Sequence, residues 1–144
     1  RLCRPSRLSV HGKTAWGCAM TLGHCLCGAV ALEFDGAPNG VAHCHCDSCG
    51  RNCSAPFPTF RGLSDGKWRR TGTMPRTFHH RPGAGRMFCP TCGSPMAFRG
   101  DRWPGDIHFY AASLDDPAAV TPGLNVNWAA HLPRTALADG LPTE

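Results

Sequence analysis

Long apolar runs are absent from this sequence, and their absence excludes two classes of protein. No stretch approaches the ~20 apolar residues that a membrane-spanning helix needs, so no membrane partner is expected. Arg1, Arg4, Arg7 and Lys13 lie near the start, but no apolar run of about 7–15 residues follows to complete a secretory signal. Paired cysteines without such a signal are more often metal-binding or redox-active than disulfide-bonded. We therefore expect a cytoplasmic protein.

A basic surface of the kind that binds nucleic acid is also missing. The net charge is +5, but residues 1–19 supply four positive charges and no negative ones, which leaves a balance of +1 for the rest of the chain. No basic stripe is interleaved with aromatic residues. Because nucleic-acid binding depends on concentrated positive charge, nucleic acid is not an expected partner.

The sequence has no internal repeat beyond its cysteine pairs, and its 144 residues fit one domain of ordinary size. Residues 1–19 show no apolar periodicity, whereas Met20 opens a segment with the pattern of a folded domain. We expect Met20 to be the native start, residues 1–19 to be a non-native or disordered extension, and residues 20–144 to be the domain. Cys3 and Cys18 would then have no role, which leaves eight cysteines to explain.

Glycine and proline are abundant, with 17 and 13 residues, against a typical combined share of roughly 12 per cent. This composition favours short strands and turns over long helices. Alternation and turn residues predict strands at 28–34, 41–44, 56–60, 67–71, 76–80, 86–89, 95–100 and 106–113. Helical spacing is limited to about two turns after Cys46 and to one turn at 115–120. The expected fold class is mainly β, in a single domain.

Two of the cysteine pairs lie about sixty residues apart, at Cys25 and Cys27 and at Cys89 and Cys92. The second pair is followed by Gly93, as in a zinc knuckle. Four thiolates make a closed, tetrahedral, structural zinc site, and such a site can add roughly 10–16 kcal/mol to folding, against ~2–5 for a disulfide. A redox dithiol at the second pair would need a βαβ setting, which this sequence lacks.

Three further thiols lie within six residues, at Cys44, Cys46 and Cys49. The first two share a strand face, and the last two share a helix face. A zinc ion with three thiolate ligands keeps its fourth position free for water or substrate, as in reactive sites. Three thiolates give the site a formal charge of −1, so it would activate water weakly but could hold an incoming thiol as a thiolate. A thiol substrate is therefore favoured.

Cys53 leaves two interpretations open. Cys46, Cys49 and Cys53 stand at i, i+3 and i+7, so they share one face of any helix. Cys53 could then be a fourth ligand that closes the second site and makes it inert. We favour the alternative, in which a small buried cysteine packs against the strands.

The histidines near these thiols are not expected to be ligands. His43 and His45 flank Cys44, and on a strand they would point away from the face that carries the cysteines. We expect His45 to be a packing or surface residue. His79 and His80 are expected to be an exposed pair on a strand.

Five motifs of this sequence together resemble the glutathione-dependent formaldehyde-activating (GFA) family, also described as the centromere protein V/GFA domain. They are GHCLCGAV (23–30), AHCHCDSC (42–49), RMFCPTCGSPMAF (86–98), ASLDDP (112–117) and LADGLP (137–142), and they span about 120 residues. The resemblance implies an all-β, zinc-stabilised fold shaped like a tent, the "β-tent". It also implies two zinc ions per chain, a structural one and a catalytic one. The structural ligands would be Cys25, Cys27, Cys89 and Cys92, and the catalytic ligands Cys44, Cys46 and Cys49.

The sequence departs from the family's pattern at three places. The basic pair that usually follows the third catalytic cysteine is here Gly50-Arg51, a Pro-Trp pair is Pro133-Arg134, and a usual histidine is Asn125. Arg51 is a possible glutathione contact, and Arg86 is a second candidate for holding the carboxylates of that thiol.

The family's activity implies an enzyme of the carbon–sulfur lyase type, resembling S-(hydroxymethyl)glutathione synthase. Its partners would be a small thiol such as glutathione, bound at the three-cysteine zinc, and an aldehyde such as formaldehyde. The alternative is a structural zinc module that binds a protein partner, favoured if Cys53 closes the second site. A third possibility is chromatin association, because one vertebrate centromere protein shares the domain, but the near-neutral charge of residues 20–144 argues against it.

Overall fold

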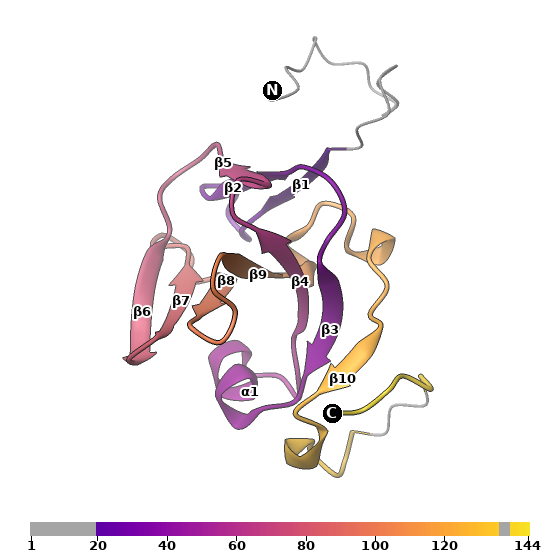
Figure 1. Ribbon diagram of the computed structural model, residues 1–144. Coiled ribbons are helices and arrows are strands. Elements are labelled where there is room, and N and C mark those ends of the chain that lie inside the picture. Colours follow the sequence, from indigo (N-terminus) through magenta and orange to yellow (C-terminus); the bar gives the residue numbers. More distant parts are fainter. Residues whose placement is uncertain (1–19, 136–138) are drawn as a thin grey trace.

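The computed structural model describes residues 20–135 and 139–144, and these residues form two β-sheets and a few short helical segments (Figure 1). The expectation about residues 1–19 lies outside the described residues. Within the described part of the chain, no helix has both the length and the apolar character to cross a membrane. The mainly β fold class expected from the sequence is confirmed.

The smaller sheet has the strand order β1-β2-β5 and is antiparallel. The larger sheet has the order β10-β3-β4-β9-β8-β7-β6, antiparallel except where β10 runs parallel to β3. Figure 1 shows the smaller sheet at one end of the molecule and helix α1 at the other. The strands are β1 (Thr21–His24), β2 (Ala31–Phe34), β3 (Gly40–Cys44), β4 (Thr59–Ser64), β5 (Trp68–Arg70), β6 (Arg76–Arg81), β7 (Ala84–Phe88), β8 (Pro95–Gly100), β9 (Asp106–Tyr110) and β10 (Leu124–Val126).

The helical segments are short, as the composition predicts. They are α1 (Asp47–Cys53) and the 3-10 turns η1 (Ala111–Ser113), η2 (Pro117–Ala119) and η3 (Trp128–Ala130). The strand expected at 106–113 therefore ends at Tyr110, because the chain turns into η1 there. The strand expected at 28–34 begins only at Ala31, since Gly28 has a positive φ of 76° in a turn.

The main hydrophobic core lies between the two sheets. Phe34 of β2 meets Phe109 of β9 edge to face, with ring centroids 4.8 Å apart, and Leu63 and Ile107 are fully buried beside them. Cys25 and Cys89 belong to the same buried cluster, with 1% and 0% exposure. The sulfur atoms of the first cysteine group are therefore part of the core.

A second, smaller hydrophobic cluster surrounds the three closely spaced cysteines. Its buried members are Cys44, Cys49, Phe60 and Tyr110. Helix α1 presents Cys49 to this cluster, while Asp47 lies in the first turn, where a negative charge interacts favourably with the helix dipole. The two cysteine groups therefore lie in separate hydrophobic clusters.

The glycine at position 72 is required by a close approach of two backbone segments. The N–H groups of Thr71 and Thr73 donate to the carbonyls of Ala31 and Ala29, at 3.0 and 2.7 Å. A Cβ atom on Gly72 would lie 2.3 Å from the Ala29 oxygen, so the pairing would have to open.

We expect Gly72→Ala to lower the free energy of unfolding by about 1–3 kcal/mol, the usual cost of overpacking. Gly40→Ala is the control, because a Cβ atom there meets nothing within 4 Å, and its effect should stay within about 0.5 kcal/mol. Urea unfolding followed by circular dichroism measures both. Equal midpoints for the two variants would contradict the close approach.

Candidate metal centres

Two tight turns hold the first cysteine group. After β1, the N–H of Gly28 donates to the Cys25 carbonyl at 2.9 Å, and after β7 the N–H of Gly93 donates to the Cys89 carbonyl at 2.9 Å. Both glycines have a φ of 76°, which residues with a Cβ atom rarely adopt. Each turn therefore presents two cysteines on one side, and the two turns face each other.

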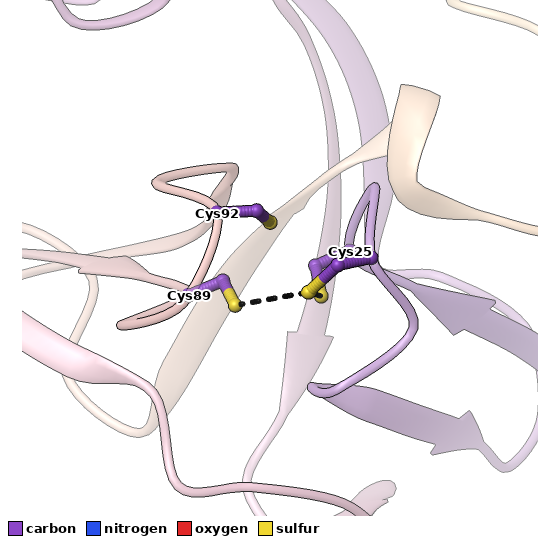
Figure 2. A group of neighbouring side chains, drawn as sticks. Cys25, Cys89 and Cys92 are labelled. Carbon is purple, nitrogen blue, oxygen red and sulfur yellow. Dashed lines mark hydrogen bonds between the residues drawn. The ribbon is translucent and has the colours of Figure 1, made fainter.

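The Sγ atoms of Cys25, Cys27, Cys89 and Cys92 all lie within 4.8 Å of one another. The Sγ atoms of Cys25 and Cys27 are 3.5 Å apart, and those of Cys27 and Cys89 are 3.8 Å apart. Figure 2 shows Cys89 and Cys92 extending from their turn toward Cys25 on the opposite loop. All eight cysteines of the described residues are free thiols, so this group could hold a metal ion.

Hydrogen-bond donors are directed at these sulfurs. The N–H of Val30 donates to Cys25 Sγ at 3.2 Å. The Ser94 hydroxyl accepts the N–H of Leu26 at 3.1 Å, so its own proton can reach Cys92 Sγ, also at 3.1 Å. The side chain and backbone of Ser94 lower the pKa of Cys92 to about 5. The turns therefore favour thiolate here.

The second group contains Cys44, Cys46 and Cys49, whose Sγ atoms also lie within 4.8 Å of one another. Cys44 ends β3, Cys46 precedes α1 with extended backbone angles, and Cys49 lies in the helix. The strand-to-helix transition brings the three sulfurs together, with the Sγ atoms of Cys44 and Cys46 3.5 Å apart.

Each sulfur of the second group has its own side-chain neighbour able to donate a hydrogen bond. The Asn127 amide donates to Cys44 Sγ at 3.4 Å, and the Arg86 guanidinium donates to Cys49 Sγ at 3.6 Å. The Ser48 hydroxyl lies 3.5 Å from Cys46 Sγ. Asn127 has a φ of 57°, a left-handed conformation that asparagine tolerates better than most residues.

The three thiols of this group cannot all ionise without added positive charge. Hydrogen bonds from Cys44 and Cys49 lower the pKa of Cys46. Contact with Cys46 raises the pKa of Cys44, and contacts with Cys44 and then Cys46 raise the pKa of Cys49. A bound cation would relieve this conflict, because it stabilises all three thiolates together.

Cys53 does not join the three sulfurs of the second group. Its thiol donates to the backbone carbonyls of Cys49 at 3.1 Å and Gly50 at 3.7 Å. Cys46, Cys49 and Cys53 are spaced to share a helix face. However, Cys53 is the last residue of α1, and its thiol is hydrogen-bonded to these backbone carbonyls instead of facing the other sulfurs.

Arg51 and Arg86 are placed differently from each other. Arg51 pairs with Asp47 at 2.8 Å on the exposed side of α1, where its side chain is 80% exposed. Arg86 of β7 is 5% exposed and reaches Cys49. Of the two arginines considered from the sequence, only Arg86 therefore contacts a cysteine sulfur.

The nearby histidines pack rather than face the thiols. His45 is buried, its Nε2 lies 2.8 Å from Asn125 Oδ1, and its ring contacts Phe57 and Trp128. His43 Nδ1 lies 2.9 Å from the Thr59 hydroxyl.

His80 is exposed on β6, but it lies near the second group. Desolvation and the positive charges of Arg86 and Arg81 lower the pKa of His80, while Cys46 acts in the opposite direction. His80 on the edge strand β6 is therefore within electrostatic range of the second cysteine group, which the sequence did not indicate.

An open groove of about 680 Å³ lies beside the first cysteine group, with Cys25 in its lining but none of Cys44, Cys46 and Cys49. Leu26 and Ser94 of the first group's turns lie at one part of it, and Cys53 and Tyr110 at another. The lining is mostly apolar, so a small organic molecule could be accommodated beside Tyr110.

These features define a small β protein with two cysteine groups that could each hold a metal ion. The family model of the "glutathione-dependent formaldehyde-activating enzyme" matches residues 20–130, well over half of the chain. The chain therefore belongs to the glutathione-dependent formaldehyde-activating family, as the motifs predict.

One solved structure is similar in fold. It is a Rhodobacter sphaeroides protein whose crystal structure was a structural genomics target, and the match has 23% sequence identity and a TM-score of 0.57. The match covers 70% of this chain and 91% of that chain. No curated protein matches the sequence.

The two cysteine groups are expected to respond differently to loss of one thiol. Cys89 is fully buried in the main core and joins segments about sixty residues apart, so Cys89→Ala should strongly reduce soluble protein. Cys46 is only partly buried beside the smaller cluster, so Cys46→Ala should fold but bind one metal ion fewer. Soluble yield, melting temperature and the metal-to-protein ratio measure these effects. Similar melting of both variants would contradict this division of roles.

Proposed function

We propose that both cysteine groups bind Zn²⁺. Tetrahedral zinc holds thiolates at about 2.3 Å, which puts the sulfurs about 3.8 Å apart, and sulfur separations of 3.5 and 3.8 Å occur in the first group. All-sulfur donor sets favour zinc or iron–sulfur centres over hard cations such as Mg²⁺. Membership of the family supports the same metal.

The proposed roles differ because the numbers of ligands differ. Four thiolates in the first group would fill a tetrahedral site and leave no position for substrate. Three thiolates in the second group would leave one position open. The observation that carries this proposal is Cys53, whose thiol donates to the Cys49 carbonyl at 3.1 Å instead of joining the other three sulfurs.

The proposed activity is the addition of a thiol such as glutathione to formaldehyde, a carbon–sulfur lyase-type reaction run toward synthesis. When bound, the second zinc would lower the pKa of the incoming thiol, so that its sulfur is present as a thiolate. This sulfur attacks the carbonyl carbon, a C–S bond forms, and the C=O π electrons move to oxygen. The resulting alkoxide takes up one proton, equal to the one that the thiol lost, and the product is an S-hydroxymethyl thioether.

Tyr110 is a candidate donor for the developing alkoxide. Its hydroxyl oxygen accepts a hydrogen bond from Asn52 at 2.7 Å and lies 3.5 Å from Arg86 Nη1. Burial raises the pKa of Tyr110 to about 12, so the hydroxyl keeps its proton and can donate it in a hydrogen bond. A fixed donor near the new oxyanion lowers the barrier to addition.

Arg51 is the proposed exposed contact for a carboxylate of glutathione. It would have to exchange its partner Asp47, and because that pair is exposed it contributes little to stability. The exchange should therefore cost little free energy.

We also propose that residues 20–144 form the functional domain.

X-ray absorption and elemental analysis test the two-zinc proposal. Protein purified without chelator should contain close to two zinc ions per chain. Glutathione should replace the one light-atom neighbour of the second zinc by sulfur, so the average over both sites should rise from about 3.5 to about 4 sulfur neighbours per zinc. Cys53→Ser should behave like the parent. If Cys53 is a ligand instead, every zinc has four sulfur neighbours at rest, glutathione changes nothing, and the structural-module alternative is favoured.

The reaction itself is measured by nuclear magnetic resonance with ¹³C-formaldehyde and glutathione. We expect the parent to accelerate adduct formation above the uncatalysed rate, and Cys46→Ala to lose that acceleration. Parent and Cys46→Ala rates equal to the background would contradict the catalytic proposal while leaving the metal proposal intact.

A further inference from the structure

Arg86 is a buried cation without a carboxylate partner among the described residues. Its side chain is 5% exposed, and none of the ion pairs in that part of the chain includes it. Its guanidinium donates to Ser48 Oγ at 3.0 Å and Cys49 Sγ at 3.6 Å, and it lies over the Phe98 ring at 5.1 Å. A buried charge is costly unless it is paired, so a counter-ion is required.

The second cysteine group can supply that counter-ion when a metal ion binds and its thiols ionise. Tyr110 is the other polar side chain in contact with Arg86, and it is neutral because burial raises its pKa to about 12. Cys49 is then the ionisable acid in contact with the guanidinium. The same guanidinium reaches Cys46 indirectly, since Ser48 accepts from Arg86 and lies 3.5 Å from Cys46 Sγ.

We propose that Arg86 is the counter-ion of the second cysteine group, and that its fixed charge favours both metal loading and an anionic thiolate as the ligand of that site. The identity of the ligand rests on the proposed function, whereas the effect on metal loading does not.

The direction of both effects follows from the charges. Three neutral thiols that bind a divalent ion release three protons, so the charge of the group changes from 0 to −1. Entry of a thiolate changes it from −1 to −2. Each step adds negative charge beside Arg86. The guanidinium therefore stabilises the state after each step more than the state before it.

β7 places this charge without any local sequence signal. Arg86 pairs with Phe98 of β8 in the sheet register, and its guanidinium carbon lies over the aromatic ring. Three residues later, Cys89 belongs to the first group. Strand β7 thus carries the counter-ion of one candidate metal centre, and the turn that follows it carries a ligand of the other.

Cobalt-substituted protein tests the inference, because the Co²⁺ spectrum reports the number of thiolate ligands. Competition with a chelator measures metal affinity, and titration with a thiol measures ligand affinity. The probes are glutathione and 2-mercaptoethanol, which has no carboxylate. We expect Arg86→Met to weaken second-site metal binding by about 10- to 100-fold, the effect of losing a charge-assisted hydrogen bond. The binding of both thiols should weaken by a similar factor. Arg86→Lys should recover part of the lost metal affinity and part of the lost thiol affinity.

The control is Arg61→Met. Arg61 is 2% exposed, but its guanidinium donates to the Gly36 carbonyl and lies over Phe34, in the main core. Arg61→Met removes a buried positive charge that lies outside the cluster of the second cysteine group, so the metal and thiol affinities of that group should match those of the parent. Retention of the first metal ion by every variant establishes that the domain is folded.

Three outcomes separate the possibilities. Unchanged metal and thiol affinities in Arg86→Met would overturn the inference. Weakening of glutathione alone would also overturn it and would make Arg86 a carboxylate contact. If the parent binds neither thiol, the proposed function and the ligand half of the inference fail, while the metal competition still decides whether Arg86 is the counter-ion.

Discussion

The fold depends on bringing seven sulfur atoms together in two groups, each within 4.8 Å. At this distance, the negative charge of one thiolate disfavours ionisation of its neighbours. The arrangement is therefore stable only where positive charge or hydrogen-bond donors compensate. Cys25 and Cys89 lie in the centre of the main core, and the strands around them are three to six residues long. A core built from such short strands gains much from a tie between its early and late segments. The first cysteine group can provide that tie, because its two turns precede β2 and β8.

The same local device recurs in both cysteine groups. In each, a serine stands two residues after a cysteine, at Ser94 after Cys92 and at Ser48 after Cys46. Each serine oxygen accepts a hydrogen bond from a distant segment and lies within 3.1 or 3.5 Å of its cysteine sulfur. The distant donor is a backbone N–H in the first group and a guanidinium in the second. Both groups thus connect their sulfurs to another part of the fold, but only the second does so with a full charge.

The sequence could predict what depends on local spacing. The grouping of Cys25 with Cys27, and of Cys44 with Cys46, follows from neighbouring positions, and the short helix after Cys46 follows from its periodicity. The mainly β class follows from the glycine and proline content. The joining of the two distant cysteine pairs was also predicted from their motifs, but the other contacts across many residues had no such signal. Asn127 reaches Cys44 across 83 positions and Arg86 reaches Cys49 across 37, and neither pairing follows any periodicity. Cys53 had the right periodicity for a ligand, but it ends the helix and donates to a carbonyl.

The difference between the groups has a consequence for which of them can change its ligands. With a divalent ion, four thiolates carry −2, and the first group spreads this charge over backbone N–H groups and the exposed Cys27. Exchange of a ligand there would gain nothing, because all four positions of a tetrahedral ion would be filled. In the second group, three thiolates on a divalent ion would carry −1, and Arg86 would offset that charge, so the group with its arginine would be neutral before a substrate entered. In the proposed function, an entering thiolate would bring the total to −1, and the partly exposed Cys46 could share that charge with solvent. A single guanidinium beside an open position would therefore favour the entry of an anionic sulfur ligand.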